Sequence, residues 1–453
     1  MLHGSIAFCV MVGLMLGSII LFPTAAAEFS GMSYIDNGVI KIGINLDIGG
    51  AITYLSPSDS EENAINSHDW GRQIQMSFYS GPNPYQPEGT EVRESWKFLG
   101  WNPIQSGDCF GNGSKVIAYR NDGNSLYVKC IPMQWPMNNV PGKCTFEVWI
   151  SLDGKIAKVR SKINNARDDH TQYAARGQEL PAVYTNGAYY RLFTYTGDKP
   201  YTGGPLHQIT KVWDTRKGVN VEGGPWDNWY ATENWAALVR EDDFGVGIWS
   251  PGSYRYTGGF AGNPGKGGPK DGPTGYYAPL RREILDHNIE YAYEYMLILG
   301  QLDEIRQFVY DNTPRKNVPS YRFDKNRQSW TLQNAHDAGW PINGVWSVSL
   351  DAKNTVLRGP DAFWNAVDMS EVHLRAAFDT GQDHAMLRWE EYNGKGGELR
   401  FPVKSDGKMR DYIIDLSQSV AYTGPCSRLL LCPVADGAQR RSIAVEYIGV
   451  KMD

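Results

Sequence analysis

The 453-residue sequence has no long run of basic residues, and its formal net charge is −6. Proteins that bind nucleic acid carry clustered Lys and Arg that neutralise phosphates, so this composition argues against a nucleic-acid partner. The acidic balance also disfavours an acidic polymer, although less strongly. Charged residues make up 21% of the chain, whereas Trp and Tyr are plentiful, with 15 and 26 copies.

Several motifs of metal, phosphate and nucleophile chemistry are also missing. The chain has no metal-ligand spacing such as H-E-x-x-H and no G-x-S-x-G nucleophile elbow. Its glycine-rich stretch from Gly258 to Gly275 places Phe260 and Gly267 where a phosphate-binding loop requires Gly and Ser or Thr. We therefore expect no metal site and no cofactor, and we interpret this stretch as a rim loop.

The amino-terminal region has no Lys or Arg, and an apolar run extends from Ile6 to Phe22. Small residues follow Pro23 up to Ala27, which is the pattern of a cleaved signal peptide. A retained single membrane anchor is the alternative, because the run is long enough to span a bilayer. We expect residues 1–27 to be removed and the mature protein to be secreted.

Cysteine is scarce, and Cys9 lies within the expected leader. The other five are Cys109, Cys130, Cys144, Cys426 and Cys432. In an oxidising compartment, local disulfides are expected within 130/144 and within 426/432, with the fifth thiol left over. Sequence does not fix this connectivity, and all five are thiols if the export prediction fails. The sequon Asn112-Gly113-Ser114 predicts a glycoprotein.

Most of the chain has the pattern of short β-strands. Apolar or alternating runs recur at intervals of about ten residues and are separated by Gly, Asp and Pro turns, as in an antiparallel sandwich. Gln301 to Tyr310 is the one clear helical pattern, and Pro314 and Pro319 follow it. Because the chain is too long for one ordinary core, we predict an all-β protein with domains at 28–312 and 318–453.

The stretch from Gly177 to Tyr195 contains one acid, Glu179, before a β-rich run. The Asn-Gly pair at 186–187 predicts a hairpin that would bring Tyr184, Tyr190 and Arg191 close to that acid. A carboxylate beside tyrosines is typical of clefts that bind sugars, since it combines stacking faces with a proton-transfer group. A core hairpin with a structural glutamate is the alternative.

Two further segments combine the residue types that sugars need. Asp69 and Arg72 are expected to orient sugar hydroxyls, or alternatively to form an ion pair that fixes a loop. A second cluster interleaves three tryptophans with acids and amides, which suits stacking on sugar rings as well as core packing. Its proposed binding residues are Trp226, Trp229, Glu233 and Trp235.

Short motifs resemble two known families. The tail resembles the closing strands of a galactose-binding-like jelly roll. The motifs that carry this resemblance are R-D-Y-I-I-D-L-S from Arg410, S-R-L-L-L-C-P-V and S-I-A-V-E-Y-I-G-V. The family's Trp-x-Gly is replaced by Ala421-Tyr422-Thr423-Gly424, so a tryptophan-based binding role is not carried over. The N-terminal portion is similar to the supersandwich of galactose-mutarotase-like proteins and related polysaccharide lyases. The motifs that carry this similarity are G-V-I-K-I-G-I-N-L-D-I-G-G-A-I, D-W-G-R and E-Y-M-L-I-L-G. The mutarotase histidines match no position here.

These resemblances imply a large antiparallel β-supersandwich, one short helix and a C-terminal β jelly roll. They also imply a carbohydrate partner, with the active site on the sandwich itself. We predict a secreted glycoside hydrolase with Glu179 and Glu283 as its two carboxylates. A polysaccharide lyase is the second hypothesis, with Tyr184 or Tyr190 as base and an arginine, Arg191 or Arg72, at the uronate. A non-catalytic, lectin-like protein is the third.

Overall fold

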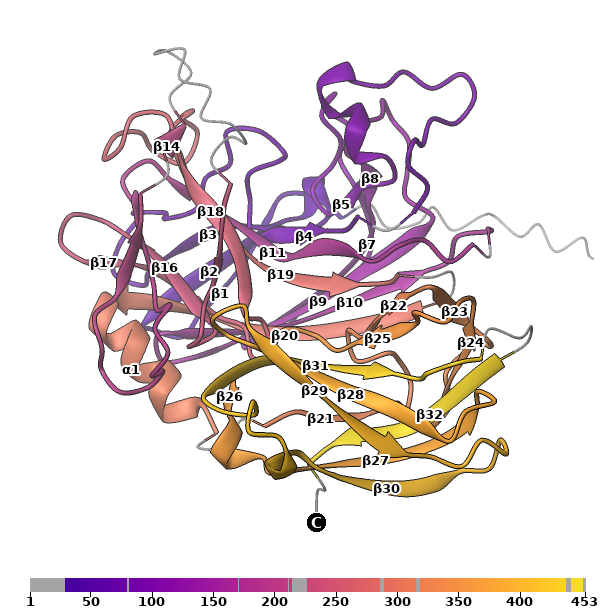
Figure 1. Ribbon diagram of the computed structural model, residues 1–453. Helices are drawn as coiled ribbons and strands as arrows, with labels where there is room; N and C mark the ends of the chain where they lie inside the picture. Colours follow the sequence, from indigo (N-terminus) through magenta and orange to yellow (C-terminus); the bar gives the residue numbers. More distant parts are fainter. Residues whose placement is uncertain are drawn as a thin grey trace, which may run out of the picture.

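The computed structural model describes residues 29–79, 81–169, 171–210, 212–213, 226–285, 289–314, 318–436 and 441–450. The expected leader, residues 1–27, lies outside this range. Figure 1 shows a chain built almost throughout from β-strands, arranged as two stacked sandwiches. The all-β fold class is therefore confirmed.

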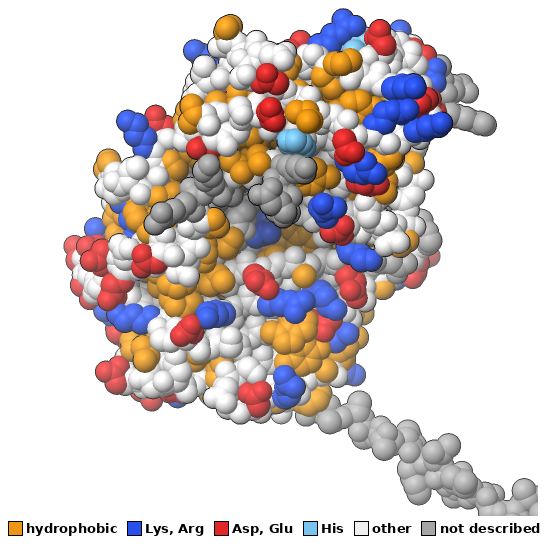
Figure 2. Space-filling view, turned by 90° about the horizontal axis from the view of Figure 1, so that it is seen from below, with side chains coloured by type: hydrophobic (Ala, Val, Ile, Leu, Met, Phe, Trp, Pro, Cys, Tyr) orange, Lys and Arg blue, Asp and Glu red, His pale blue; other side chains and the backbone are white. Residues whose placement is uncertain are grey.

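The surface of the described residues carries charges of both signs. On the face in Figure 2, Lys and Arg side chains lie beside Asp and Glu side chains, and no broad area of one sign stands out. Surface ion pairs include Arg375 with Asp411 at 2.8 Å and with Glu446 at 2.6 Å. Exposed pairs of this kind add little stability, but they keep the surface electrostatically mixed.

The N-terminal sandwich is built from two large sheets and one small sheet. The nine-stranded sheet follows the order β13 (His207–Ile209), β12 (Arg191–Thr194), β16 (Trp235–Val239), β17 (Phe244–Trp249), β20 (Ile289–Gln301), β10 (Ile156–Asn165), β9 (Cys144–Asp153), β7 (Ser125–Ile131) and β6 (Lys115–Asn121). The eight-stranded sheet follows the order β14 (Val212–Trp213), β18 (Arg255–Ala261), β19 (Thr274–Glu283), β11 (Arg176–Asn186), β4 (Gln75–Ser77), β5 (Pro103–Ile104) and β8 (Met133–Gln134), with β15 (Asp227–Tyr230) paired to β18. The small sheet contains β1 (Met32–Asp36), β2 (Ile40–Asn45) and β3 (Ala51–Pro57).

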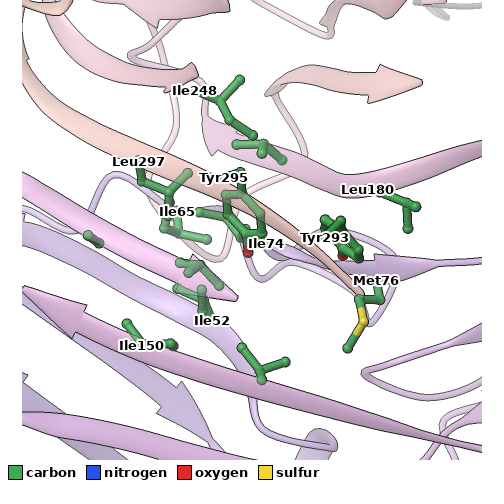
Figure 3. Packing of buried hydrophobic residues seen from close by; sticks show 14 of the residues in the cluster. Ile52, Ile65, Ile74, Met76, Ile150, Leu180, Ile248, Tyr293, Tyr295 and Leu297 are labelled. Atoms are coloured by element: carbon green, nitrogen blue, oxygen red, sulfur yellow. The ribbon is translucent and has the colours of Figure 1, made fainter. Parts of the chain in front are cut away.

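The main core of this sandwich lies between the large sheets. Figure 3 shows Met76 from β4 and Leu180 from β11 among side chains of the opposite sheet, including Tyr293, Tyr295 and Leu297 from β20. All five are buried. Full burial of a large apolar side chain stabilises the fold by about 1.5–3 kcal/mol, so this core fixes which face of the eight-stranded sheet remains available to solvent.

The predicted hairpin is wrong. β11 pairs with β19 and β4, whereas β12 pairs with β13 and β16 in the other large sheet. Asn186 and Gly187 therefore connect two sheets. A Cβ at Gly187 would lie 1.8 Å from the Lys266 carbonyl oxygen, so glycine is needed for close backbone approach. The Asn-Gly signal marks a real turn, but not the strand pairing that it usually joins.

One α-helix, α1 (Leu302–Asn312), follows β20 and confirms the helical pattern. Gln301 and Glu304 form a capping box that satisfies amide groups at its first turn. Ile305 and Val309 are fully buried and pack in a small cluster with Trp235. This packing holds the helix against the outer face of the nine-stranded sheet. The described 3-10 helices include η1 (Leu46–Ile48), η2 (Glu94–Leu99), η4 (Ala366–Asp368) and η5 (Leu416–Gln418).

The C-terminal sandwich packs two six-stranded sheets around its own core. The first follows the order β23 (Ala335–Asp337), β24 (Trp346–Leu350), β32 (Arg441–Gly449), β27 (Glu371–Asp379) and β30 (Arg410–Asp415), with β21 (Ser320–Arg322) paired to β32. The second follows the order β22 (Thr331–Gln333), β25 (Val356–Arg358), β31 (Pro425–Cys432), β28 (His384–Glu391) and β29 (Gly396–Pro402), with β26 (Trp364–Asn365) paired to β31. The buried rings of Phe323, Trp330, Trp346 and Trp389 fill much of the space between them.

Hydrogen bonds join the two sandwiches directly. Ser329 Oγ donates to Glu283 Oε2 at 3.1 Å, and the Asp337 amide donates to Gln172 Oε1 at 2.9 Å. The Tyr230 hydroxyl donates to the Ala362 carbonyl. These contacts fix the second sandwich beside one end of β19, where the two parts of the chain share a groove.

The predicted disulfides are absent, since the five cysteines at 109, 130, 144, 426 and 432 are all thiols. Cys426 and Cys432 lie on one strand, β31. Six residues of extended strand span about 20 Å, whereas a disulfide needs Cα atoms within about 7 Å. That predicted pair is geometrically impossible in this fold.

The sequon asparagine is already engaged. Asn112 Nδ2 donates to Asp108 Oδ2 at 2.8 Å and to Asn138 Oδ1 at 3.0 Å, and Ser114 is buried. A glycan on that nitrogen would have to displace both bonds.

In the described part of the chain, no helix has the length and apolar character needed to cross a bilayer.

Candidate functional site

A cleft of about 680 Å³ lies on the face of the eight-stranded sheet that points away from the main core. Its floor comes from β4, β11, β18 and β19, and its rim from η2 and neighbouring loops. The lining residues are Asp69, Gly71, Arg72, Gln75, Ser77, Tyr79, Trp96, Phe98, Leu99, Asn102, Ile104, Trp135, Arg176, Gly177, Glu179, Ala182, Tyr184, Trp226, Asn228, Thr257, Ala261, Thr274, Tyr276 and Leu280. We call this the Glu179 cleft. Its size suits a small molecule or part of a larger chain.

An irregularity in β11 decides which side chains face the cleft. Glu179, Ala182 and Tyr184 line the cleft, whereas Leu180 and Val183 are buried in the main core. Strict alternation would place the residues at 179 and 182 on opposite faces. The pairing of β11 with β4 and β19 shifts register after Glu179, and the extra residue resets the alternation. Both ends of the strand can therefore contribute to one polar floor.

Glu179 has the electrostatic properties of a proton-transfer group. Burial raises the pKa of its carboxyl to about 7, although the hydroxyls of Tyr276 and Tyr79 act in the opposite direction. Its ordinary value is 4.5. A carboxyl with a pKa near 7 exchanges protons readily at neutral pH, which is the property required of a general acid or base.

Three tyrosines surround this carboxyl. Burial, and then the negative charge of Glu179, raise the pKa values of Tyr79, Tyr184 and Tyr276 well above 10. The rings of Tyr184 and Tyr276 come from directly paired strand positions and lie 4.6 Å apart. At neutral pH these hydroxyls remain protonated, so they are hydrogen-bond donors and not bases.

Two polar atoms in the wall of the cleft lack a hydrogen-bond partner among the described residues. They are Tyr276 Oη and Asn102 Oδ1. Tyr276 and Asn102 are 1% and 0% exposed. Tyr276 Oη is near enough to Glu179 to affect its pKa, but it makes no hydrogen bond of regular geometry. Buried polar atoms rarely stay unpaired, so both are suited to contacts with a bound ligand.

Cationic side chains lie at two positions of the cleft. Arg72 pairs with Asp69 at 3.1 Å, so the expected loop-fixing ion pair is present, and both residues also line the cleft. Arg176 donates to the Leu99 carbonyl at 2.8 Å and stacks over the Tyr79 ring at 5.3 Å. Arg176 has no carboxylate partner among the described residues, so its charge can be used by an anionic ligand.

Aromatic rings form much of the rim. Trp226 is 38% exposed and meets Tyr276 edge to face at 6.5 Å. Trp96 and Trp135 lie 6.1 Å apart, and Phe98 beside them is 65% exposed. Sequence reasoning found the first of these rings but missed the other three. Their positions in loop and 3-10 segments, outside the alternating strand pattern, were the available signal, but only the fold brings them beside Glu179.

The structure does not place Glu283 in the cleft. This residue is 1% exposed, accepts from the Ile284 amide at 3.0 Å and accepts from Ser329 Oγ at 3.1 Å. It lies at the end of β19, opposite Arg176 of β11. Its carboxylate therefore joins the two sandwiches, which corrects the expectation that it would act beside Glu179.

Most of the tryptophan cluster is likewise structural. Trp229 is in the main core, stacks on Tyr256 at 5.8 Å and donates to Thr194 Oγ1 at 3.2 Å. Trp235 is fully buried and donates to Glu233 Oε2 at 3.0 Å. Only the ring at 226 reaches the cleft, because the following residues enter β15 and β16 and turn inward.

Glu233 anchors α1 to the N-terminal sandwich. It is fully buried, pairs with Arg306 at 3.1 Å and accepts from the Tyr310 hydroxyl at 2.8 Å. It also accepts from the Tyr201 amide at 2.9 Å. With four donors on one carboxylate, this residue has no free face for a sugar.

Tyr190 and Arg191 lie with the other large sheet, because the expected hairpin does not form. The Tyr190 hydroxyl donates to Glu241, and Arg191 pairs with Asp243 at 2.6 Å. Neither residue lines the Glu179 cleft. Of the predicted site residues, the fold thus brings together Asp69, Arg72, Glu179, Tyr184 and Trp226.

Among described residues, no group of three or more His, Cys, Asp or Glu side chains is arranged to hold a metal ion.

Comparison with known proteins gives likenesses only among solved structures. No family model matches the chain. No curated protein matches it either. A galactose mutarotase related enzyme from Lactobacillus acidophilus has 11% identity, with 59% of this chain and 97% of that chain covered and a TM-score of 0.36. A galactose mutarotase-like protein from Lactobacillus casei has 14% identity, with 59% and 100% covered and a TM-score of 0.38. A 4-alpha-glucanotransferase from Thermococcus litoralis has 12% identity, with 59% and 37% covered and a TM-score of 0.31.

Proposed function

We propose that this chain is a carbohydrate-active enzyme that cleaves a glycan in the Glu179 cleft. The observation that carries the proposal is Glu179 itself: a carboxyl with a pKa of about 7, on a cleft floor, flanked by protonated tyrosines. The rings of Trp96, Trp135 and Trp226 line the cleft and are suited to stacking on the apolar faces of sugars. Amide and hydroxyl groups in the same cleft are suited to sugar hydroxyls.

Elimination at a uronate is the reaction that these residues fit best. In this reaction, ionised Glu179 takes the proton from C5 of the uronate, and the electron pair forms the C4–C5 double bond. The bond from C4 to the glycosidic oxygen breaks, and that oxygen receives a proton from the Tyr276 hydroxyl. Glu179 then returns its proton to the tyrosinate, since the two groups are close enough to affect each other's pKa.

Arg176 is the group that we assign to the uronate carboxylate. The C5 proton becomes acidic only when the adjacent carboxylate is neutralised, so a lyase needs a cation there. Arg176 lines the cleft and lacks a carboxylate partner among the described residues. Arg72 is less suited, because Asp69 already pairs with it.

Hydrolysis is the second candidate, and one observation favours it. Asp69 lines the same cleft as Glu179, so two carboxyls are available in place of the pair originally expected. Glu179 would then protonate the glycosidic oxygen as general acid, and Asp69 would act as base or nucleophile. The Asp69–Arg72 ion pair would have to open or shift for that role.

Product analysis decides between the two reactions. The wild-type chain is incubated with uronate-containing and neutral polysaccharides, and absorbance near the ultraviolet band of an unsaturated uronate is followed together with reducing ends. Elimination gives both signals, whereas hydrolysis gives reducing ends alone. Neither signal with any polysaccharide would refute the enzymatic proposal and leave a glycan-binding protein.

We also propose that the protein acts outside the cell, on the strength of the apolar leader pattern in residues 1–27. Sequencing the amino terminus of the exported protein tests this proposal. An intact leader on the mature chain would favour the membrane-anchor alternative.

A further inference from the structure

A second hollow lies between the two sandwiches and continues from the Glu179 cleft. Its volume is about 540 Å³, and it is lined by residues of β11, β18 and β19 on one side and of β22, β25 and β31 on the other. Arg176, Gly177, Asn228 and Leu280 line both hollows. We call the second hollow the interdomain groove. A glycan chain bound across Glu179 can therefore extend directly into the interdomain groove.

Arginine dominates the lining of this groove. The five arginines are Arg176, Arg255, Arg282, Arg358 and Arg428. Two carboxylates act on this set. Asp361 pairs with Arg428 and lies 3.5 Å from Arg255, and Glu390 pairs with Arg428 and with Arg358 at 3.1 Å. Five positive charges against two negative charges leave an excess of three in a half-enclosed space.

The excess charge is concentrated on particular side chains. Arg282 is exposed and has neither an acceptor nor an ion-pair partner among the described residues. Burial, and then the positive charges of Arg428 and nearby Arg282, lower the pKa of Arg358. Like charges held close together are unfavourable, and an anion placed between them relieves this repulsion. Arg428 has another task, since it is 8% exposed and its guanidinium binds the Gly359 carbonyl and both carboxylates.

We propose that the interdomain groove is a subsite for the negatively charged groups of an acidic glycan that extends from the Glu179 cleft. Arg282 and Arg358 bind these groups, and Arg428 holds Asp361 and Glu390 in place. A planar guanidinium binds a carboxylate or a sulfate ester through two parallel hydrogen bonds, which is why arginine suits this recognition. The C-terminal sandwich thus supplies part of the substrate site. This inference rests on the proposed glycan-cleaving function and adds the substrate class.

The net charge of −6 for the whole chain does not conflict with this proposal. Screening limits interactions between exposed charges to a distance of about 10 Å, so the local excess in the groove decides what binds there. The surface in Figure 2 carries both signs in mixture, whereas the groove gathers an excess of positive charge from both sandwiches.

The test uses the full chain with Arg282→Gln and Arg358→Gln combined, in a Glu179→Gln background that stops turnover. Both changes should leave the fold intact, because Arg282 has no partner to lose and Glu390 keeps its bond to Arg428. The control is Arg388→Gln, which removes an arginine of similar side-chain exposure, 41% against 42%, that pairs with Glu398 outside the groove. Circular dichroism and thermal unfolding check that each variant folds.

Affinity electrophoresis measures binding in gels that contain polygalacturonate, alginate, chondroitin sulfate, carrageenan, xyloglucan or starch. We expect at least one acidic polysaccharide to retard the control chain and the arginine double variant to lose at least tenfold in affinity. The carboxylate-only and sulfate-bearing polymers distinguish the two sources of negative charge. Retardation by neutral polymers alone, retardation by none, or an affinity of the double variant within twofold of the control would overturn the proposal.

The outcome is independent of the reaction assigned to Glu179. If the arginine variant loses affinity but Glu179→Gln keeps its turnover on the same polymer, the subsite stands and the catalytic proposal fails. If Glu179→Gln is inactive but the arginine variant binds like the control, the catalytic proposal stands and the subsite fails.

Discussion

Glu179 and Leu180 are neighbours in β11 and face opposite sides of the same sheet. Leu180 is fully buried in the main core, whereas Glu179 lines the cleft. The core therefore fixes the position of the carboxyl from behind, through a side chain that cannot move without opening a cavity. A proton-transfer group on a packed strand is held more accurately than one on a loop.

The first prediction concerns turnover. Glu179→Gln should lower the rate of glycan cleavage by about 10²–10⁴-fold, the usual contribution of a positioned acid or base. Binding should persist, because the amide has the same size and still contacts the cleft. In the wild-type protein, the pH–rate profile should change slope near pH 7, the pKa of the Glu179 carboxyl.

Initial rates and calorimetric binding, measured with one polysaccharide for wild type and variant, check this prediction. Asp69→Asn, which removes a cleft carboxylate that is ion-paired to Arg72, is the comparison. A smaller loss in that variant supports elimination, and an equal loss supports hydrolysis. Unchanged rates in Glu179→Gln would remove this residue from the mechanism.

The second prediction concerns stability and pH. The folded pKa of about 7 exceeds the ordinary value of 4.5, so the folded state binds this proton more tightly than the unfolded state. The contribution of Glu179 to the free energy of unfolding is therefore highest below about pH 4.5 and decreases as the pH rises to about 7. Above pH 7 the buried charge costs up to about 3 kcal/mol.

Glu179→Gln should remove this loss. Urea unfolding at several pH values should show little difference from wild type near pH 4.5 and a more stable variant above pH 7. Glu61→Gln, which changes an exposed carboxylate in the loop after β3, is the control for the substitution itself. A stability difference between Glu179→Gln and wild type that does not change with pH would mean that burial does not raise the pKa of the Glu179 carboxyl.

Much of this architecture could be predicted from the sequence, because strand patterns are local. Apolar and polar residues alternate in β7, β9, β10 and β20. The capping residues and the apolar stripe of α1 lie close together in the sequence. Which strands pair is not local, so the Asn-Gly turn at 186–187 predicted a hairpin where the chain crosses between sheets. The register shift that turns Ala182 and Tyr184 toward the cleft also depends on neighbours far away in the sequence.

The site could be predicted only in part, because residue types can be read from the sequence but strand pairing and burial cannot. Glu179 and Trp226 were identified from composition, yet Trp229, Trp235 and Glu233 have the same residue types and are buried instead. Composition alone does not distinguish a tryptophan that packs in the core from one that reaches the cleft. The groove arginines were missed because they are dispersed from position 176 to 428 in a chain of net negative charge.

The third prediction separates these two kinds of tryptophan. Trp226→Ala should weaken glycan binding by about tenfold through loss of a stacking face, with little change in stability. Trp235→Ala should instead lower the free energy of unfolding by about 3–5 kcal/mol, because it leaves a cavity and removes one of the donors to the buried Glu233 carboxylate. Calorimetric binding and urea unfolding on both variants give the two readouts. Loss of stability without loss of affinity at Trp226 would contradict its place in the cleft.

The fourth prediction concerns the buried Glu233–Arg306 pair. Glu233 is fully buried and Arg306 retains only 15% side-chain exposure, so removing the carboxylate charge leaves a guanidinium with little access to water. Glu233→Gln should lower the free energy of unfolding by about 3–5 kcal/mol. Because this pair ties Arg306 of α1 to the sandwich, hydrogen exchange should rise first in Leu302–Asn312.

Glycan affinity is the second readout for this variant. The donors to Glu233 are Arg306 and Tyr310 of α1, Trp235 of β16 and the Tyr201 amide, and none of these residues lines the cleft. Affinity measured well below the melting temperature should therefore stay within about twofold of wild type. Arg306→Lys, which keeps the charge but loses the fork of donors, should recover part of the stability that Arg306→Ala loses. A large loss of affinity in folded Glu233→Gln would return this residue to the binding site and contradict the structural role assigned to it.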